Sequence, residues 1–213
     1  MTPDRRRACV ALLLAACVPT RALAGAYDDF FKAIELDNGA EVRSLLERGF
    51  DPDTRDPKGE HGLYLALRSG AGKAFAALLL HPRISVDAVN PNGETPLMMA
   101  ALRANVDAMR QLIARGAAVR RDGWTPLHYA ASSPQVEPVR VLLDLGAAID
   151  VQAPNGNTPL MLAARWGHED SVILLLTRGA DRRLTNRNGL DAAAYARLDG
   201  RETVARRLEA AGP

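Results

Sequence analysis

Apolar residues recur along this chain in short, evenly spaced blocks. Four of the five blocks have two apolar positions, two spacers and then Gly, a residue that favours the left-handed cap of a helix, and the last block has Glu209 at its second position. The pattern predicts a series of short helices, each stopped by Gly, and we expect Leu143 to lie in the core. The blocks are LLERG (45–49), LIARG (112–116), LLDLG (142–146), LLTRG (175–179) and LEAAG (208–212).

A second motif alternates with the first and marks where helices begin. Thr is a good helix N-cap, and Pro is well tolerated at the first helical position. The motif returns every 30 to 34 residues, so we expect a tandem repeat of turn, helix, helix and Gly stop. Its copies are GETPLMMAA (93–101), GWTPLHYAA (123–131) and GNTPLMLAA (156–164), with weaker copies at 59–67 and 189–197.

These residues resemble the ankyrin repeat family, whose units open on the T-P-L motif. The resemblance covers roughly residues 26–212. It implies an all-α solenoid of about six helix-turn-helix units, capped at both ends, with β-turn fingers and a concave face. No unit can bury its apolar face alone, so stacking forms the core. The predicted units lie near 26–55, 56–89, 90–119, 120–152, 153–185 and 186–213.

Two stretches depart from the repeat. Gly116 and Gly123 bracket one finger and are seven positions apart, whereas the corresponding glycines of the next two units are ten positions apart. We therefore expect the finger before Trp124 to protrude less and to leave a notch. The sequence SSPQ (132–135) stands where the next unit has Gly-His, which predicts an altered turn between the two helices of this unit.

The first 24 residues are predicted to be an export signal. MTPDRRR (1–7) is basic, the run after it is apolar but too short for a stable membrane anchor, and a small-x-small cleavage site ends at Ala24. We expect cleavage between Ala24 and Gly25, which leaves the repeat domain at 25–213. One alternative is a lipobox that ends at Cys17, where lipidation would anchor the chain. The other is a mildly hydrophobic first helix.

Removal of this signal changes what the composition implies. The signal carries four Arg and one Asp, so the net charge falls from +2 to about −1 and no basic arm for nucleic acid remains. Both cysteines, Cys9 and Cys17, lie in the signal, which excludes disulfides and thiolate chemistry from a chain cut after Ala24. We predict a monomer that meets a membrane only through a lipid on Cys17.

Candidate residues for catalysis are few. His128 fills the histidine position of the repeat motif, where Met98 and Met161 stand in sister units, so we expect it to pack and hydrogen-bond locally. No two histidines have the i, i+4 spacing of a helical zinc site, and no nucleophile motif or phosphate loop is present. The sequence predicts no catalytic residue, no metal ligand and no cofactor.

The resemblance implies that the fingertips and the ends of the first helices meet partners. Trp is enriched at binding hot spots, and arginines on one lip of the groove favour a carboxylate-bearing surface. The predicted partner-binding residues are Arg68, Arg103, Arg121, Asp122, Trp124, Ser132, Asn155, Asn157, Arg165, Trp166, Arg187 and Asn188.

We therefore expect a non-catalytic module that binds a protein on its concave face. Its expected location is the bacterial periplasm, with lipid anchoring or secretion as alternatives. A narrower version is an inhibitor or immunity protein that covers a toxin or hydrolase. Two other functions stay open. One is an effector delivered to a eukaryotic host, where it would mimic host ankyrin scaffolds. The other is a periplasmic stress-defence or cofactor-related protein.

Overall fold

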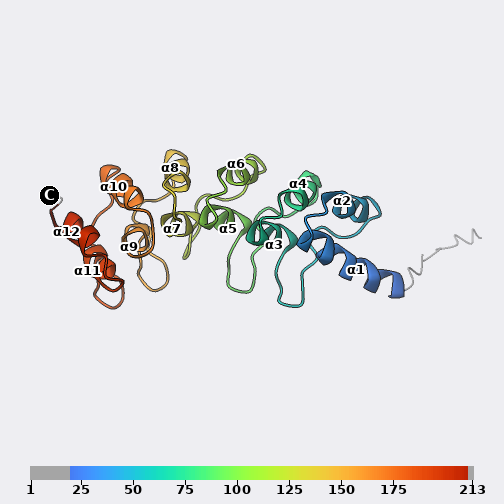
Figure 1. The fold of residues 1–213 in the computed structure, drawn as a ribbon, viewed down its shortest axis with the longest axis horizontal. Coiled ribbons are helices and arrows are strands. Elements are labelled where there is room, and N and C mark those ends of the chain that lie inside the picture. The colour runs from blue at the N-terminus through green and yellow to red at the C-terminus, as the bar shows by residue number, and fades with distance from the viewer. Residues whose placement is uncertain (1–19, 211–213) are drawn as a thin grey trace, which may run out of the picture.

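The computed structural model describes residues 20–210, which form an elongated array of helices (Figure 1). These residues contain twelve α-helices and no β-strand, so the predicted all-α solenoid is confirmed. None of the twelve is long and apolar enough to cross a membrane. The helices are α1 (Thr20–Glu35), α2 (Gly39–Glu47), α3 (Gly62–Ser69), α4 (Gly72–Leu80), α5 (Pro96–Leu102), α6 (Val106–Ala114), α7 (Pro126–Ala131), α8 (Glu137–Asp144), α9 (Pro159–Arg165), α10 (Glu169–Thr177), α11 (Ala192–Arg197) and α12 (Glu202–Ala210).

Consecutive helices form pairs, and the pairs stack along the array. Helices α1, α3, α5, α7, α9 and α11 form one row, and the loops that precede five of them project as fingers (Figure 1). Helices α2, α4, α6, α8 and α10 form the second row, and α12 packs against α11 at the end. The finger before α7 is visibly shorter than its neighbours, as the spacing of glycines predicts.

The Thr-Pro step begins helices as expected. The Thr95 and Thr158 hydroxyls each accept a hydrogen bond, at 3.3 Å, from the backbone N–H three residues further on. Each cap satisfies one of the N–H groups that a helix start leaves without an intrahelical acceptor. The Pro that follows lacks an N–H and has a fixed φ that suits the first turn.

The Gly stops within residues 20–210 also form as expected, whereas Gly212 lies outside the described residues. Gly116 has φ +91°, which lies in the left-handed region, and its N–H donates to the Ile113 carbonyl at 2.9 Å. The next N–H, of Ala117, donates to the Leu112 carbonyl at 3.0 Å. These bonds close the last turn of α6 and redirect the chain into the next finger.

The core is a continuous layer between the two rows of helices. Leu112 and Leu142 are fully buried at equivalent places in α6 and α8. Leu143, which the pattern places in the core, is only partly buried at its margin. The predicted core position is therefore wrong by one residue, because the first Leu of the LLDLG block, Leu142, faces inward.

The turn between α7 and α8 differs from its neighbours, in agreement with the sequence. α8 begins without a side-chain cap, whereas the Asn105 side chain accepts a hydrogen bond from the Ala108 N–H at the start of α6. In the next unit Gly167 packs against this turn: a Cβ on it would lie 2.1 Å from the Ala131 carbonyl oxygen. Only Gly fits at this contact between units.

Most of the predicted export signal, including Cys17, lies outside the described residues. α1 begins at Thr20, so the predicted cleavage site between Ala24 and Gly25 falls within this helix. Cleavage there would remove the start of α1 and leave its buried residues Phe30 and Ile34 in place.

Candidate partner-binding surface

Trp166 is the most exposed aromatic anchor on the row of first helices. It is the C-cap of α9, and 51% of its surface is accessible to solvent. The Arg165 guanidinium lies 4.6 Å from the centre of the Trp166 ring and 5.0 Å from that of Tyr195. Its Nε and Nη2 donate to the two carboxylate oxygens of Asp199, each at 3.2 Å. The indole is therefore held in a fixed position and offered to solvent.

The three arginines predicted on one lip of the groove, Arg68, Arg103 and Arg165, differ in their ion pairs. Arg165 is neutralised by Asp199 of the last unit, and Arg68 donates to the carboxylate of Glu60 within its own unit. Arg103, the C-cap of α5, is exposed and makes no ion pair within residues 20–210. Of the three, Arg103 alone keeps its charge free of an ion pair within the described residues.

Asn157 is also a correction to the predicted set. Its side chain is 2% exposed and cannot meet a partner. Its Nδ2 donates to the Tyr195 hydroxyl and its Oδ1 accepts from Asn186 Nδ2, both at 2.9 Å. Both partners belong to the next unit, so Asn157 joins units instead.

The neighbouring fingertips remain available. Asn155, Arg187 and Asn188 are exposed, and the Arg187 N–H donates to the Asn155 carbonyl at 3.0 Å. This bond sets the two tips side by side. Ser132, at the end of α7, is half-buried and donates its hydroxyl proton to the His128 carbonyl at 3.1 Å.

Trp124 behaves differently from Trp166. It is half-buried, and its ring meets those of His128 and Tyr129 edge-on at 5.3 and 6.3 Å between centroids. These contacts are with its own unit. Trp124 therefore supports the base of the shortened finger and presents only part of its surface to a partner.

Sequence reasoning missed a carboxylate that joins three units. Glu94 accepts hydrogen bonds from the Tyr64 hydroxyl at 2.6 Å, the Tyr129 hydroxyl at 2.8 Å and Asn90 Nδ2 at 2.7 Å. Burial opposes the charge of Glu94, but these hydrogen bonds outweigh it and lower the pKa of the carboxyl. The signal for this cluster was a polar residue before the motif Thr, with Tyr in the motifs on either side.

His128 has the local role expected of it. It is fully buried, its Nδ1 accepts the Thr125 N–H at 3.2 Å, and its Nε2 lies 3.0 Å from the Asn157 carbonyl oxygen of the next unit. Burial lowers the pKa of His128 to about 4, so the ring is neutral near neutral pH. With Nδ1 accepting, Nε2 carries the proton and donates it to that carbonyl.

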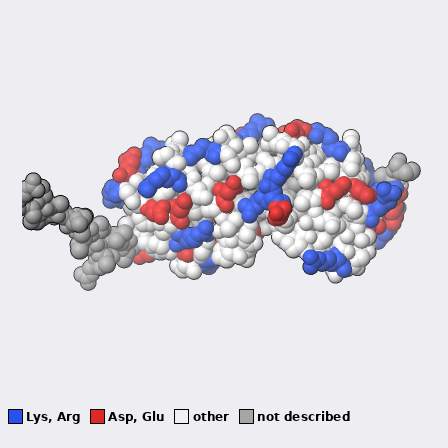
Figure 2. All heavy atoms as spheres, turned by 180° about the vertical axis from the view of Figure 1, so that it is seen from behind, with Lys and Arg blue, Asp and Glu red and all other residues white. Residues whose placement is uncertain are grey.

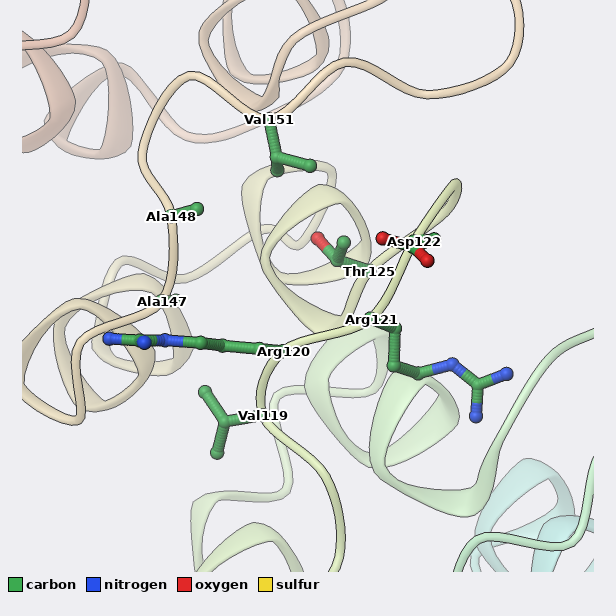
Figure 3. Close-up of a pocket in the computed structure, with 8 residues that line it drawn as sticks. All are labelled: Val119, Arg120, Arg121, Asp122, Thr125, Ala147, Ala148 and Val151. Carbon is green, nitrogen blue, oxygen red and sulfur yellow. The ribbon is translucent and has the colours of Figure 1, made fainter.

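The expected notch is present beside the shortened finger. A hollow of about 430 Å³ lies between the finger and the loop after α8 (Figure 3). The two predicted fingertip residues Arg121 and Asp122 line it, together with Arg120 and Thr125.

Charges of both signs are scattered over the face drawn in Figure 2, with no large patch of one sign. Within residues 20–210 no three His, Cys, Asp or Glu side chains gather as a metal site. The surface instead offers a fixed aromatic anchor, exposed cations such as Arg103 and a row of polar tips. A stack of helix pairs with such a surface defines a repeat scaffold for protein–protein interaction.

Comparison with known proteins places this scaffold in a family. The family model for ankyrin repeats (3 copies) matches residues 30–120, 63–153 and 135–211. The chain belongs to the ankyrin repeat family.

Individual relatives are found in bacteria and in eukaryotes. A putative ankyrin repeat-containing protein of Treponema pallidum is 39% identical over 176 residues, which are 81% of this chain and 48% of that protein. The E3 ubiquitin-protein ligase KEG of Arabidopsis thaliana is 32% identical over 162 residues, 74% of this chain and 10% of that protein. The chain thus spans less than half the length of either relative.

A solved structure matches most of the array. It is the complex of Bd0816, a predatory endopeptidase from Bdellovibrio bacteriovorus, with the immunity protein Bd3460. The matching chain has a TM-score of 0.73 and 25% sequence identity, and the match covers 86% of this chain and 98% of that chain.

Proposed function

We propose that this protein is a non-catalytic binding module of the bacterial envelope that acts as an inhibitor or immunity protein against a hydrolase. The match to a chain of an endopeptidase–immunity protein complex carries this proposal, because it covers 98% of that chain. A fold alone does not fix function, so the surface must supply the rest of the support.

The surface supports binding through a preformed site. Trp166 is held by Arg165, which Asp199 and Tyr195 hold in turn, so little side-chain freedom is lost when a partner packs on the indole. Binding to a pre-organised surface costs less conformational entropy than binding that orders loops. Exposed Trp residues of this kind dominate the binding energy of many interfaces. Arg103 adds a free charge for an acidic group of the partner.

The envelope location rests on the N-terminal sequence. A basic start, a short apolar run and a small-x-small site that ends at Ala24 are typical of a cleavable export signal. Cell fractionation with a tag on the C-terminus tests this part separately. Protein found in the periplasm supports the proposal, whereas protein found inside host cells during infection would favour the delivered effector.

Capture from envelope extracts tests the function. We expect the wild-type protein to retain a hydrolase and to suppress its activity on peptide or cell-wall substrates when the two are mixed. The double variant Arg103→Glu, Trp166→Ala should lose both effects, because both residues lie at ends of first helices. Ile173→Ala is the matched control, since it removes an exposed apolar side chain from α10 in the other row. If the captured hydrolase kept its full activity in the presence of this protein, the proposed inhibitor function would be contradicted.

A further inference from the structure

A repeated hydrogen bond ties the loops of neighbouring units together. At three junctions an Asp carboxylate, four positions after the Gly position that ends a second helix, accepts a backbone N–H from the loop of the next unit. Each bond satisfies a loop donor and fixes the distance between two loops. The bonds run from the N–H of Ser85 to Asp53, of Ala118 to Asp87 and of Asp181 to Asp150, at 2.9 to 3.0 Å.

The junction between the loops after α6 and α8 breaks this rule. Arg120 stands four positions after Gly116, just as Asp150 stands four positions after Gly146. The equivalent donor is the N–H of Ala148, and it makes no hydrogen bond to any of residues 20–210. Arg120 donates its Nε–H to the Gly146 carbonyl at 2.7 Å instead. At this junction the Ala148 N–H donor is present, but Arg120 stands where the other junctions have the accepting aspartate.

The space left at this junction is open. The hollow of about 430 Å³ lies here, and its walls include the apolar side chains of Val119, Ala147 and Val151. In Figure 3 Arg120 extends across to the loop of Ala147 and Ala148. The finger on this side is the shortened one, so it does not cover the opening.

The polar groups around the hollow favour an anion. The two terminal nitrogens of Arg120 make none of the hydrogen bonds in the described part of the chain. The N–H of Ala148, a residue that also lines the hollow, is a further donor without an acceptor there. Arg121 also lines the hollow, with its side chain directed away from Arg120 (Figure 3). Asp122, on the finger beside Thr125, is the one acidic residue among those that line the hollow. An Arg and a backbone N–H together suit a planar carboxylate.

We propose that this hollow binds a carboxylate of a protein partner, which takes the place of the missing aspartate. The carboxylate accepts hydrogen bonds from the Ala148 N–H and the Arg120 guanidinium, while the apolar walls hold the adjoining methylene group. Positions where a fold departs from its own local rule are commonly functional sites. Only the source of the carboxylate rests on the proposed function, because the hollow itself is built from this chain alone.

The test is a titration followed through the amide resonances of the ¹⁵N-labelled protein. The probes are N-acetyl-aspartic acid α-amide, which has only a side-chain carboxylate, N-acetyl-alanine, which has only a terminal one, and neutral N-acetyl-alaninamide. We expect a saturable downfield shift of the Ala148 resonance with a carboxylate probe and none with the neutral amide. A response to one probe alone tells whether the partner offers an acidic side chain or a chain terminus. No saturable shift with either carboxylate overturns the proposal.

Three variants make the titration specific. Arg120→Asp should restore the internal bridge, abolish the shift and raise the melting temperature. Arg120→Gln removes the cation without supplying an acceptor, and should weaken binding about tenfold, which corresponds to ~1.4 kcal/mol. Arg110→Gln is the matched control, since it removes an exposed cation of α6 that does not line the hollow, and it should bind as the wild type does. Unchanged binding by Arg120→Asp would contradict the proposal. The titration uses no protein partner. A failed titration therefore counts against the carboxylate site, and a failed capture experiment counts against the proposed function.

Discussion

At the scale of single residues, buried polar groups connect one unit to the next. His128 is one of them, and both of its ring nitrogens are engaged. Its pKa is lowered to about 4 by burial, although the hydrogen bond to the Asn157 carbonyl acts in the opposite direction. The folded protein therefore resists protonation of this ring until the solution is strongly acidic.

This lowered pKa predicts how stability depends on pH. Unfolded histidine titrates near ~6.5, so between about pH 6.5 and the folded pKa the unfolded state binds a proton that the folded state does not. The free energy of unfolding should fall as the pH falls through this window, by at most ~1.4 kcal/mol per pH unit from this group. His128→Met should remove that slope, since Met98 and Met161 already fill the same position.

The free energy of unfolding, measured by urea denaturation at about pH 7 and about pH 5, gives this slope for the wild type and for His128→Met. Carboxyl groups ordinarily titrate below this range of pH. Glu94 should contribute only below it, since its pKa is lowered and its stabilising charge is lost as the pH falls further. Equal pH slopes for the wild type and His128→Met would show that the ring does not titrate in this way.

Asn157 gives a second test at this scale. Asn157→Ala should cost about 1–3 kcal/mol, because it leaves the buried Tyr195 hydroxyl and the Asn186 amide without partners. Asn188→Ala, on the exposed tip of the next finger, should change the unfolding midpoint far less, because its side chain makes no hydrogen bond within the described residues. Similar losses for the two variants would mean that the fingers between these units are arranged differently.

At the scale of helices and turns, stability depends on close contacts between units. Gly167→Ala places a Cβ against the backbone of Ala131 and Ala163, and such overpacking costs about 1–3 kcal/mol or more. Gly72→Ala is the control: Gly72 begins α4, has no atom within 4 Å of the added methyl group, and should tolerate Ala or gain slightly. Thermal unfolding of both variants is the measurement, and equal melting temperatures would be inconsistent with this packing.

The inward face of α8 is tested by neighbouring leucines. Leu142→Ala should cost about 2–5 kcal/mol, because the side chain is fully buried and a cavity remains. Leu143→Ala should cost less, since its side chain lies at the margin of the core. A larger loss of unfolding free energy for Leu143→Ala would reverse the register of this helix.

The elements were predictable from sequence because local rules fix them. Thr-Pro caps, Gly stops and the interval between motifs act within a few residues of the chain, so they can be read directly. The finger before Trp124 was predicted in the same way, by counting residues between two glycines.

The surface was less predictable, because its side chains form hydrogen bonds and ion pairs with residues of other units. Arg165 pairs with Asp199, which is 34 positions away, and Glu94 meets Tyr129 across 35. Such pairs depend on how the units stack. Asn155 and Asn157 look alike in sequence, and only the stacking shows that one is exposed and the other buried.

At the scale of the whole molecule, the array is a rigid surface built from nearest-neighbour contacts. Each unit buries its apolar face against the next, and the polar bridges set the spacing between loops. The first helices thus present the Trp166 indole, held by Arg165, and the exposed Arg103, while the junction at Arg120 remains open. This arrangement accounts for binding through shape and a few anchors, with no need for the chain to reorder.

The central claim is that a protein partner binds the row of first helices, and one measurement tests it most directly. The dissociation constant of the captured partner should be measured by calorimetry for the wild type, Trp166→Ala and Ile173→Ala. A buried Trp anchor contributes ~2 kcal/mol or more, so Trp166→Ala should weaken binding about thirtyfold or more, while Ile173→Ala should leave it unchanged. Unchanged affinity for Trp166→Ala, with loss for Ile173→Ala, would place the partner on the opposite row of helices and contradict the account.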